Sequence, residues 1–149
     1  MKQILITLLL SVLTLFISLL LFINNYFKAD EEYYILHNEK ISSISRIVGK
    51  RNLKYKKLST LLDKKTLSKT YYYNNIKNVS NDLNLYINYL RENENYLVTK
   101  PYDLNKEKDI IELSKYSKEE NYIILLNIEY NKNSYKINIS RLKGSIKND

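Results

Sequence analysis

Cysteine and tryptophan are absent from the 149 residues, and only one proline and one histidine are present. Without cysteine the chain has no disulfide framework, no thiolate zinc site, no iron–sulfur cluster, no cysteine nucleophile and no lipid-modified cysteine. The single histidine, His37, forms neither a catalytic triad nor a zinc site on its own. Two glycines are too few for a glycine-rich phosphate-binding loop. The sequence therefore predicts a non-enzymatic protein without cofactors, metal ligands or catalytic residues.

Aromatic residues other than tyrosine are confined to the first 27 residues, where all three phenylalanines lie. Tyrosine buries a large ring, but its hydroxyl needs water or a hydrogen-bond partner. The remainder of the chain is therefore expected to have a thin core whose tyrosine rings reach the surface.

A long apolar run near the N-terminus is the clearest feature that is present. Residues 4–23 read ILITLLLSVLTLFISLLLFI, twenty residues without charge, glycine or proline. A helix of that length, at about 1.5 Å per residue, spans the roughly 30 Å hydrocarbon core of a bilayer. A cleaved signal peptide is the alternative, but its apolar region is normally shorter and ends at small residues, and Phe27 is bulky. Residues 1–28 are therefore predicted to be a single-pass signal anchor in the cell membrane.

The polar residues within this run share one helix face, because their spacings are four, three and four residues. Hydroxyl side chains on such a face allow close helix–helix contact, with a second copy or with another membrane protein. The alternative is that they bond carbonyls of their own helix and are merely tolerated. The residues are Thr7, Ser11, Thr14 and Ser18.

The N-terminal tail before the run is only three residues long, and long C-terminal domains cross a membrane regardless of their charge. The N-terminus is therefore expected inside and the C-terminal domain outside the cytoplasm.

Positive charge is concentrated just beyond the anchor, since residues 50–69 contribute +7 of the net +8. Their leucines are compatible with a short amphipathic helix. Such a stretch near a bilayer binds anionic lipid headgroups, and outside the cell it also meets anionic envelope polymers. Nucleic acid is disfavoured because no stacking platform accompanies the charge, and a solvated lysine-rich linker is the remaining alternative. The cations are Lys50, Arg51, Lys54, Lys56, Lys57, Lys64, Lys65 and Lys69.

Hydrophobic periodicity predicts a small α+β fold beyond the anchor, with a three- to four-stranded, mainly antiparallel sheet and helices on one face. Residues 29–65 are expected to form a juxtamembrane segment, and residues 66–149 the folded domain. Helices are predicted at 39–48, 78–90 and 106–117, strands at 67–76 and 96–99, and a C-terminal β-hairpin at 121–142 with its loop at 131–133.

Three stretches carry a family resemblance: DLNLYINYL at 82–90, IIELSK at 110–115, and NIEYNKNSYKI followed by RLKGS at 127–145. With them, residues 70–144 resemble the C-terminal part of uncharacterised single-pass membrane-anchored proteins of low-GC Gram-positive bacteria. The resemblance implies an anchored small domain and adds no activity.

Together these features predict a membrane-anchored accessory protein whose basic segment contacts an anionic membrane surface or envelope polymer. The alternative is an assembly subunit that docks a partner through the Ser/Thr face of its transmembrane helix and through the edge of its sheet.

Overall fold

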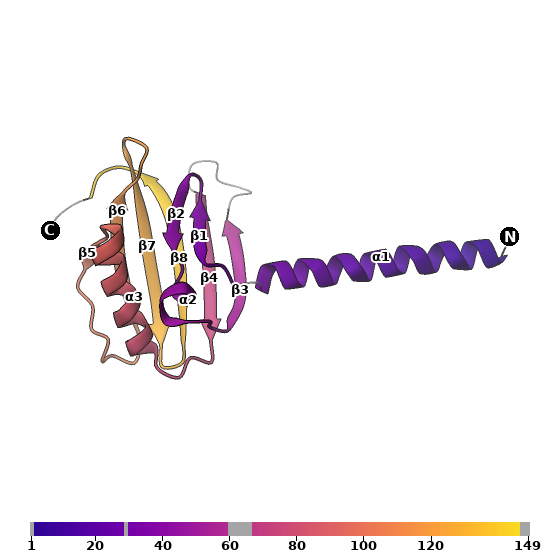
Figure 1. Cartoon of the computed structure of the whole chain (residues 1–149), viewed down its shortest axis with the longest axis horizontal. Helices are drawn as coiled ribbons and strands as arrows, with labels where there is room; N and C mark the ends of the chain where they lie inside the picture. The colour runs from indigo at the N-terminus through magenta and orange to yellow at the C-terminus, as the bar shows by residue number, and fades with distance from the viewer. Residues whose placement is uncertain (1, 29, 60–66, 147–149) are drawn as a thin grey trace.

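The computed structural model describes residues 2–28, 30–59 and 67–146. Helix α1 (Lys2–Lys28) extends away from a domain that contains the other elements (Figure 1). In chain order these are β1 (Tyr33–Leu36), β2 (Glu39–Ser42), α2 (Ile44–Val48), β3 (Leu53–Ser59), β4 (Leu67–Asn74), α3 (Val79–Glu94), β5 (Leu97–Lys100), β6 (Asp109–Tyr116), β7 (Tyr122–Asn131) and β8 (Ser134–Lys143).

The main sheet has six strands in the order β3-β4-β8-β7-β6-β5, and every neighbouring pair is antiparallel. Strands β1 and β2 form a separate antiparallel hairpin. The predicted α+β class and the mainly antiparallel sheet are confirmed, whereas the predicted three or four strands are too few. The predicted C-terminal hairpin is β7–β8, and it lies inside the sheet because β4 and β6 flank it.

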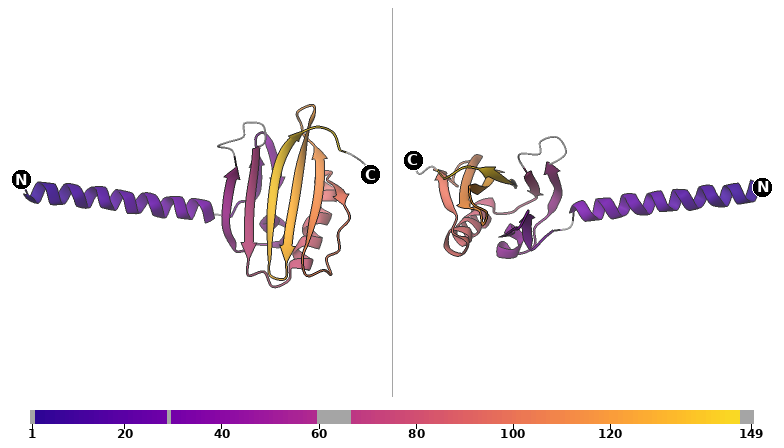
Figure 2. Two further views of the ribbon diagram at one scale, coloured as in Figure 1. Left: turned by 180° about the vertical axis from the view of Figure 1, so that it is seen from behind. Right: turned by 90° about the horizontal axis from the view of Figure 1, so that it is seen from above.

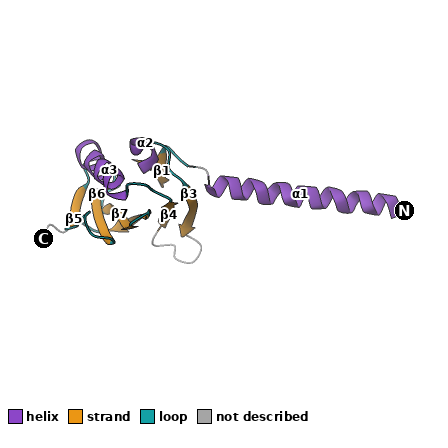
Figure 3. Ribbon diagram, turned by 90° about the horizontal axis from the view of Figure 1, so that it is seen from below, coloured by secondary structure: helices purple, strands orange, loops and turns teal. Residues whose placement is uncertain are grey.

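One face of the sheet is covered by α3, α2 and the β1–β2 hairpin (Figure 1), and Figure 3 shows both helices on the same side. The opposite face, called the bare face below, carries no helix (Figure 2, left). The covered face forms the core, where register aligns Tyr71, Ile137, Ile128 and Ile111 in one buried row. Alternation along each strand therefore separates a buried from a solvent-facing set of side chains.

The sequence suggested that the tyrosine rings reach the surface; Tyr55 and Tyr116 do, at 41% and 63% exposed, but other tyrosines lie in the core. Tyr34, Tyr73 and Tyr86 are fully buried. Their hydroxyls are satisfied internally, since those of Tyr34 and Tyr73 lie 3.0 Å apart and that of Tyr86 donates to the carbonyl of Ser42 at 2.9 Å. Burial raises the pKa of all three hydroxyls. They pack as large core residues because hydrogen bonds replace the water that the hydroxyls lose.

Helix α3 follows from its sequence. Asn78 is its N-cap, with the side chain accepting from the amide of Asn81 at 3.0 Å. Asn95 ends it in the left-handed conformation. The predicted apolar stripe is buried against the sheet and consists of Val79, Leu83, Tyr86, Ile87 and Leu90.

The helix predicted at 106–117 is wrong, because residues 109–116 form β6. Its apolar residues fit a helix by spacing, yet the strand sends Ile111 and Leu113 into the core and leaves Ile110 and Tyr116 exposed. Eight register pairs with β7 decide the outcome, since they satisfy backbone groups of β7 that a helix at this position would leave unpaired.

Of two further helix predictions between the anchor and β4, the one at 39–48 is confirmed only over α2, and the one in the basic stretch is wrong. Residues 39–48 contain β2 and the five-residue α2, which begins after Ser43, whose hydroxyl accepts from the amide of Arg46. Residues 53–59 of the basic stretch form β3 instead of an amphipathic helix. Strands β1–β3 add Tyr34, Leu36 and Leu53 to the common core, so residues 30–59 pack as part of the domain.

Glu39 ties β2 to the loop between β6 and β7. Its carboxylate accepts hydrogen bonds of 2.7 Å from the Ser117 hydroxyl and from the Lys118 amide. Burial alone would raise the pKa of Glu39, but these hydrogen bonds outweigh it and hold the pKa below its ordinary value.

Glu39→Gln is expected to lower the free energy of unfolding by about 1–2 kcal/mol at pH 7, because hydrogen bonds to a charged group are replaced by weaker ones. A lowered folded-state pKa gives stability that is present above the unfolded pKa of about 4.3 and is lost as pH falls through the folded value. The difference from the native chain should therefore shrink below about pH 4 in urea titrations. Glu92→Gln, at an exposed position of α3, is the matched control and should show no such pH dependence.

Candidate functional site

The eight cations predicted to contact an anionic surface are placed in different environments. Lys54 and Lys57 are exposed on β3, and Lys50 is exposed in the loop before it. Lys69 lies on β4 and is half-buried on the covered face, in register with Ile139. Two of the cations, Arg51 and Lys56, are engaged by acidic residues of the domain. Lys64 and Lys65 lie outside the described residues.

Strand β3 is the edge of the sheet next to α1, as both views of Figure 2 show. Its exposed lysines, Lys54 and Lys57, make no ion pair with the acidic residues that the structure describes. Lysines on an edge strand also oppose pairing with another chain, which is a structural reason for their presence. Part of the positive charge of residues 50–69 is therefore not neutralised by folding and lies at the sheet edge nearest the anchor.

The residues that follow α1 are bonded to the domain. The Asp30 carboxylate accepts from the Tyr73 hydroxyl at 3.2 Å. The Glu31 carboxylate accepts from Lys56 Nζ at 2.7 Å and from the Tyr71 hydroxyl at 3.1 Å. These contacts, called the junction below, hold residues 30 and 31 against β3 and β4.

The junction continues into the backbone, where the amide of Ser43 donates to the carbonyl of Glu32 at 3.0 Å. Three consecutive residues after the helix, 30–32, are thus attached to different elements. Sequence reasoning missed this junction, although three acids directly after an apolar helix were a visible signal.

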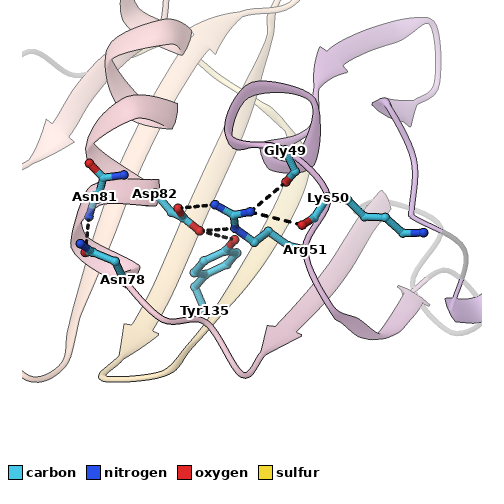
Figure 4. Close-up of polar contacts among 7 residues, drawn as sticks. All are labelled: Gly49, Lys50, Arg51, Asn78, Asn81, Asp82 and Tyr135. Carbon is cyan, nitrogen blue, oxygen red and sulfur yellow. Dashed lines mark hydrogen bonds and ion pairs between the residues drawn. The ribbon is translucent and has the colours of Figure 1, made fainter.

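Arg51 joins the start of β3 to α3 (Figure 4). Its guanidinium donates to both carboxylate oxygens of Asp82, at 2.6 and 2.7 Å, and this arrangement is bidentate. The Tyr135 hydroxyl lies 3.4 Å from the same carboxylate. Asp82 raises the pKa of Arg51 by hydrogen bonding, so the cation persists at every physiological pH. Arg51 therefore has a structural role, and its predicted contact with an anionic surface stays a prediction.

A cavity of about 360 Å³ lies beside this ion pair. Figure 4 shows that the side chain of Lys50 points away from Arg51 and Asp82. Lys50 and Arg51 therefore do not converge on one point, as the binding of a small anion between them would require. The cavity is lined by Lys50, Arg51, Asn52, Asn75, Ile76, Lys77, Asn78, Asn81 and Asp82.

The hydroxyl face predicted on α1 is partly engaged within the helix. Thr7 donates to the carbonyl of Gln3, Ser11 to that of Leu8, and Thr14 to that of Ser11, at 2.7–2.9 Å. Ser18 completes the face. Helix–helix contact through these four residues stays a prediction.

Searches against protein-family models, curated proteins and solved structures found no match. Function is therefore inferred from the residues and geometry of this chain alone.

Proposed function

We propose that this is a membrane-anchored, non-enzymatic accessory protein whose β3 edge contacts the anionic headgroups of the membrane that holds α1. Helix α1 is long and apolar enough to span a bilayer, and none of residues 6–23 is buried within the structure. An apolar helix that no protein surface covers is stabilised by lipid, whereas in water it would expose its whole surface. We place the domain outside the cytoplasm, because long C-terminal domains cross a membrane regardless of their charge.

The junction is the observation that carries the proposal. It attaches residues 30–32 to β4, β3 and the segment before α2. A flexible linker would let the domain leave the surface, whereas this attachment keeps β3 next to the end of α1. Lys54 and Lys57 are then held close to the headgroups.

The charge at this edge suits anionic lipid. A cation close to an anionic surface contributes about 1 kcal/mol, so Lys54 and Lys57 favour surface contact by about 2 kcal/mol, or roughly 30-fold. Anionic envelope polymers carry the same charge, and nucleic acid is disfavoured for a domain outside the cytoplasm. The attraction should weaken at high salt, because exposed charges are screened.

The test uses the full chain in proteoliposomes and the absence of native cysteine. A fluorophore on Asn52→Cys, just before β3, reports proximity to lipids that carry a quencher in the headgroup. Quenching should be stronger with anionic than with neutral lipid, and high salt should remove the difference. Lys54→Glu with Lys57→Glu should abolish it.

The matched control reverses two exposed lysines at the opposite side of the sheet, Lys100 and Lys108. Lys100→Glu with Lys108→Glu makes the same change in net charge and should leave the lipid dependence intact. Equal quenching in neutral and anionic vesicles, or equal effects of the two double variants, would contradict headgroup contact.

The second proposal is assembly with a partner chain through the hydroxyl face of α1 and the sheet edge. The structure supports it less than headgroup contact. Three of the four hydroxyls on α1 donate to their own helix. The sheet edge away from the anchor is β5, which has only four residues and is followed by Pro101. Short edges that end at proline are poor templates for strand addition.

A further inference from the structure

No helix or strand of the described residues covers the bare face of the sheet (Figure 2, left). Six strands about 4.8 Å apart, each with about eight residues at 3.3 Å, give a face of roughly 750 Å². A stable protein interface buries about 800 Å² per partner. The area is therefore close to what one specific partner needs.

We propose that the bare face is the interface of a homodimer, formed by two copies anchored in the same membrane. Of the proposed function, this inference uses only the insertion of α1, and headgroup contact is not required. Helix α1 lies parallel to the bare face (Figure 2, left), so a twofold axis along the membrane normal brings two bare faces together. Both anchors then enter the bilayer from the same side.

Charge permits this contact. In the three central rows of the bare face, Lys57, Lys100 and Lys136 are opposed by Glu112 and Glu129, with Lys136 and Glu129 paired at 2.5 Å. Three lysines against two glutamates give these rows a net charge of +1, in a chain whose net charge is +8. Two copies therefore meet there with little net repulsion.

Side-chain sizes on the face are self-complementary. A twofold axis parallel to the rows exchanges the two rows that flank the middle one. One flanking row holds Tyr55, Tyr72, Lys136, Glu129 and Ile110, and the other holds Ser68, Ser140, Leu125, Ser114 and Leu97.

The first of these rows consists of large side chains, whereas the second has three serines, with Leu125 and the 48% exposed Leu97 as its large members. Tyr55 and Ile110 are 41% and 43% exposed, whereas Ser114 is 2% exposed between its neighbours. The protruding row of one copy therefore lies over the recessed row of the other, as interdigitated sheet faces require.

The middle row meets its own copy across the axis. Its centre is polar and uncharged, with Thr70, Asn138 and Asn127, whose hydroxyl and amide groups can bond their counterparts. Lys57 and Lys100 at its ends, and Glu112 beside Lys100, meet like charges near the rim, where water screens them.

Cross-linking of single cysteines tests the interface, because the native chain has none. Packed sheets lie about 10 Å apart, too far for a disulfide, so a short bismaleimide is used on full-length protein in neutral-lipid vesicles at low protein density. Thr70→Cys, at the middle row, should give a covalent dimer. Leu85→Cys, 48% exposed on α3, should give several-fold less.

The alignment of rows across the proposed dimer interface is tested by mixing two single-cysteine variants. Tyr72→Cys with Ser68→Cys should cross-link more efficiently than Tyr72→Cys alone, because the axis brings the large row over the small one. In the Thr70→Cys chain, Ser140→Arg should reduce the dimer several-fold, with circular dichroism reporting that the fold is kept. Equal cross-linking at positions 70 and 85, or no dimer from folded Thr70→Cys protein, would overturn the proposal.

Discussion

Arg51→Met should lower the free energy of unfolding by about 2–3 kcal/mol, a much larger loss than any exposed lysine of the basic segment should cause. The Asp82 side chain is only 4% exposed, whereas that of Arg51 is 28% exposed. Removing the guanidinium leaves a buried carboxylate with the Tyr135 hydroxyl as its remaining side-chain partner among the described residues. Partial access of water at Arg51 keeps the loss below the 3–5 kcal/mol typical of fully buried pairs.

Urea unfolding of the full chain in a non-ionic detergent, followed by circular dichroism, measures this loss. Lys54→Met is the matched control and should change stability by no more than about 0.5 kcal/mol. Arg51→Met combined with Asp82→Leu should recover part of the loss, giving a coupling energy of about 1–2 kcal/mol. If Arg51→Met were as mild as Lys54→Met, the ion pair would have no structural role.

The parts of the fold that follow from local pattern were predictable. The apolar run of α1, the capped stripe of α3 and the two strands around residues 131–133 each carry their own signal in consecutive residues. Strand β3 does not, because an edge strand with Lys54, Lys56 and Lys57 has neither an alternating nor a helical pattern. Its conformation depends on register with β4, a tertiary term that outweighs local preference.

The roles of the cations were not predictable for the same reason. Lys56 pairs with an acid 25 residues earlier, and Arg51 with one 31 residues later. Sequence spacing shows charge but not which charges are neutralised by folding. Only the exposed members, such as Lys54 and Lys57, stay available for the surface contact that the composition indicated.

Alanine substitutions at two adjacent isoleucines of β6 distinguish most clearly between a strand and a helix at this position. Ile111→Ala should cost about 3 kcal/mol, because Ile111 is fully buried and truncation leaves a cavity. Ile110→Ala should cost less than about 1 kcal/mol, because Ile110 is 43% exposed on the bare face. Urea unfolding of the two variants under identical conditions gives the comparison.

The helix predicted from the sequence at 106–117 would give a different result. Adjacent residues of a helix differ by about 100° in direction, so Ile110 and Ile111 would both border its apolar stripe and lose similar amounts. Adjacent residues of a strand point to opposite faces, and only one of them reaches the core. Similar losses of stability for the two variants would therefore contradict a strand at residues 109–116. A large difference would place Ile110 on the face that we propose as the dimer interface, where its truncation should weaken the Thr70→Cys cross-link while leaving the fold intact.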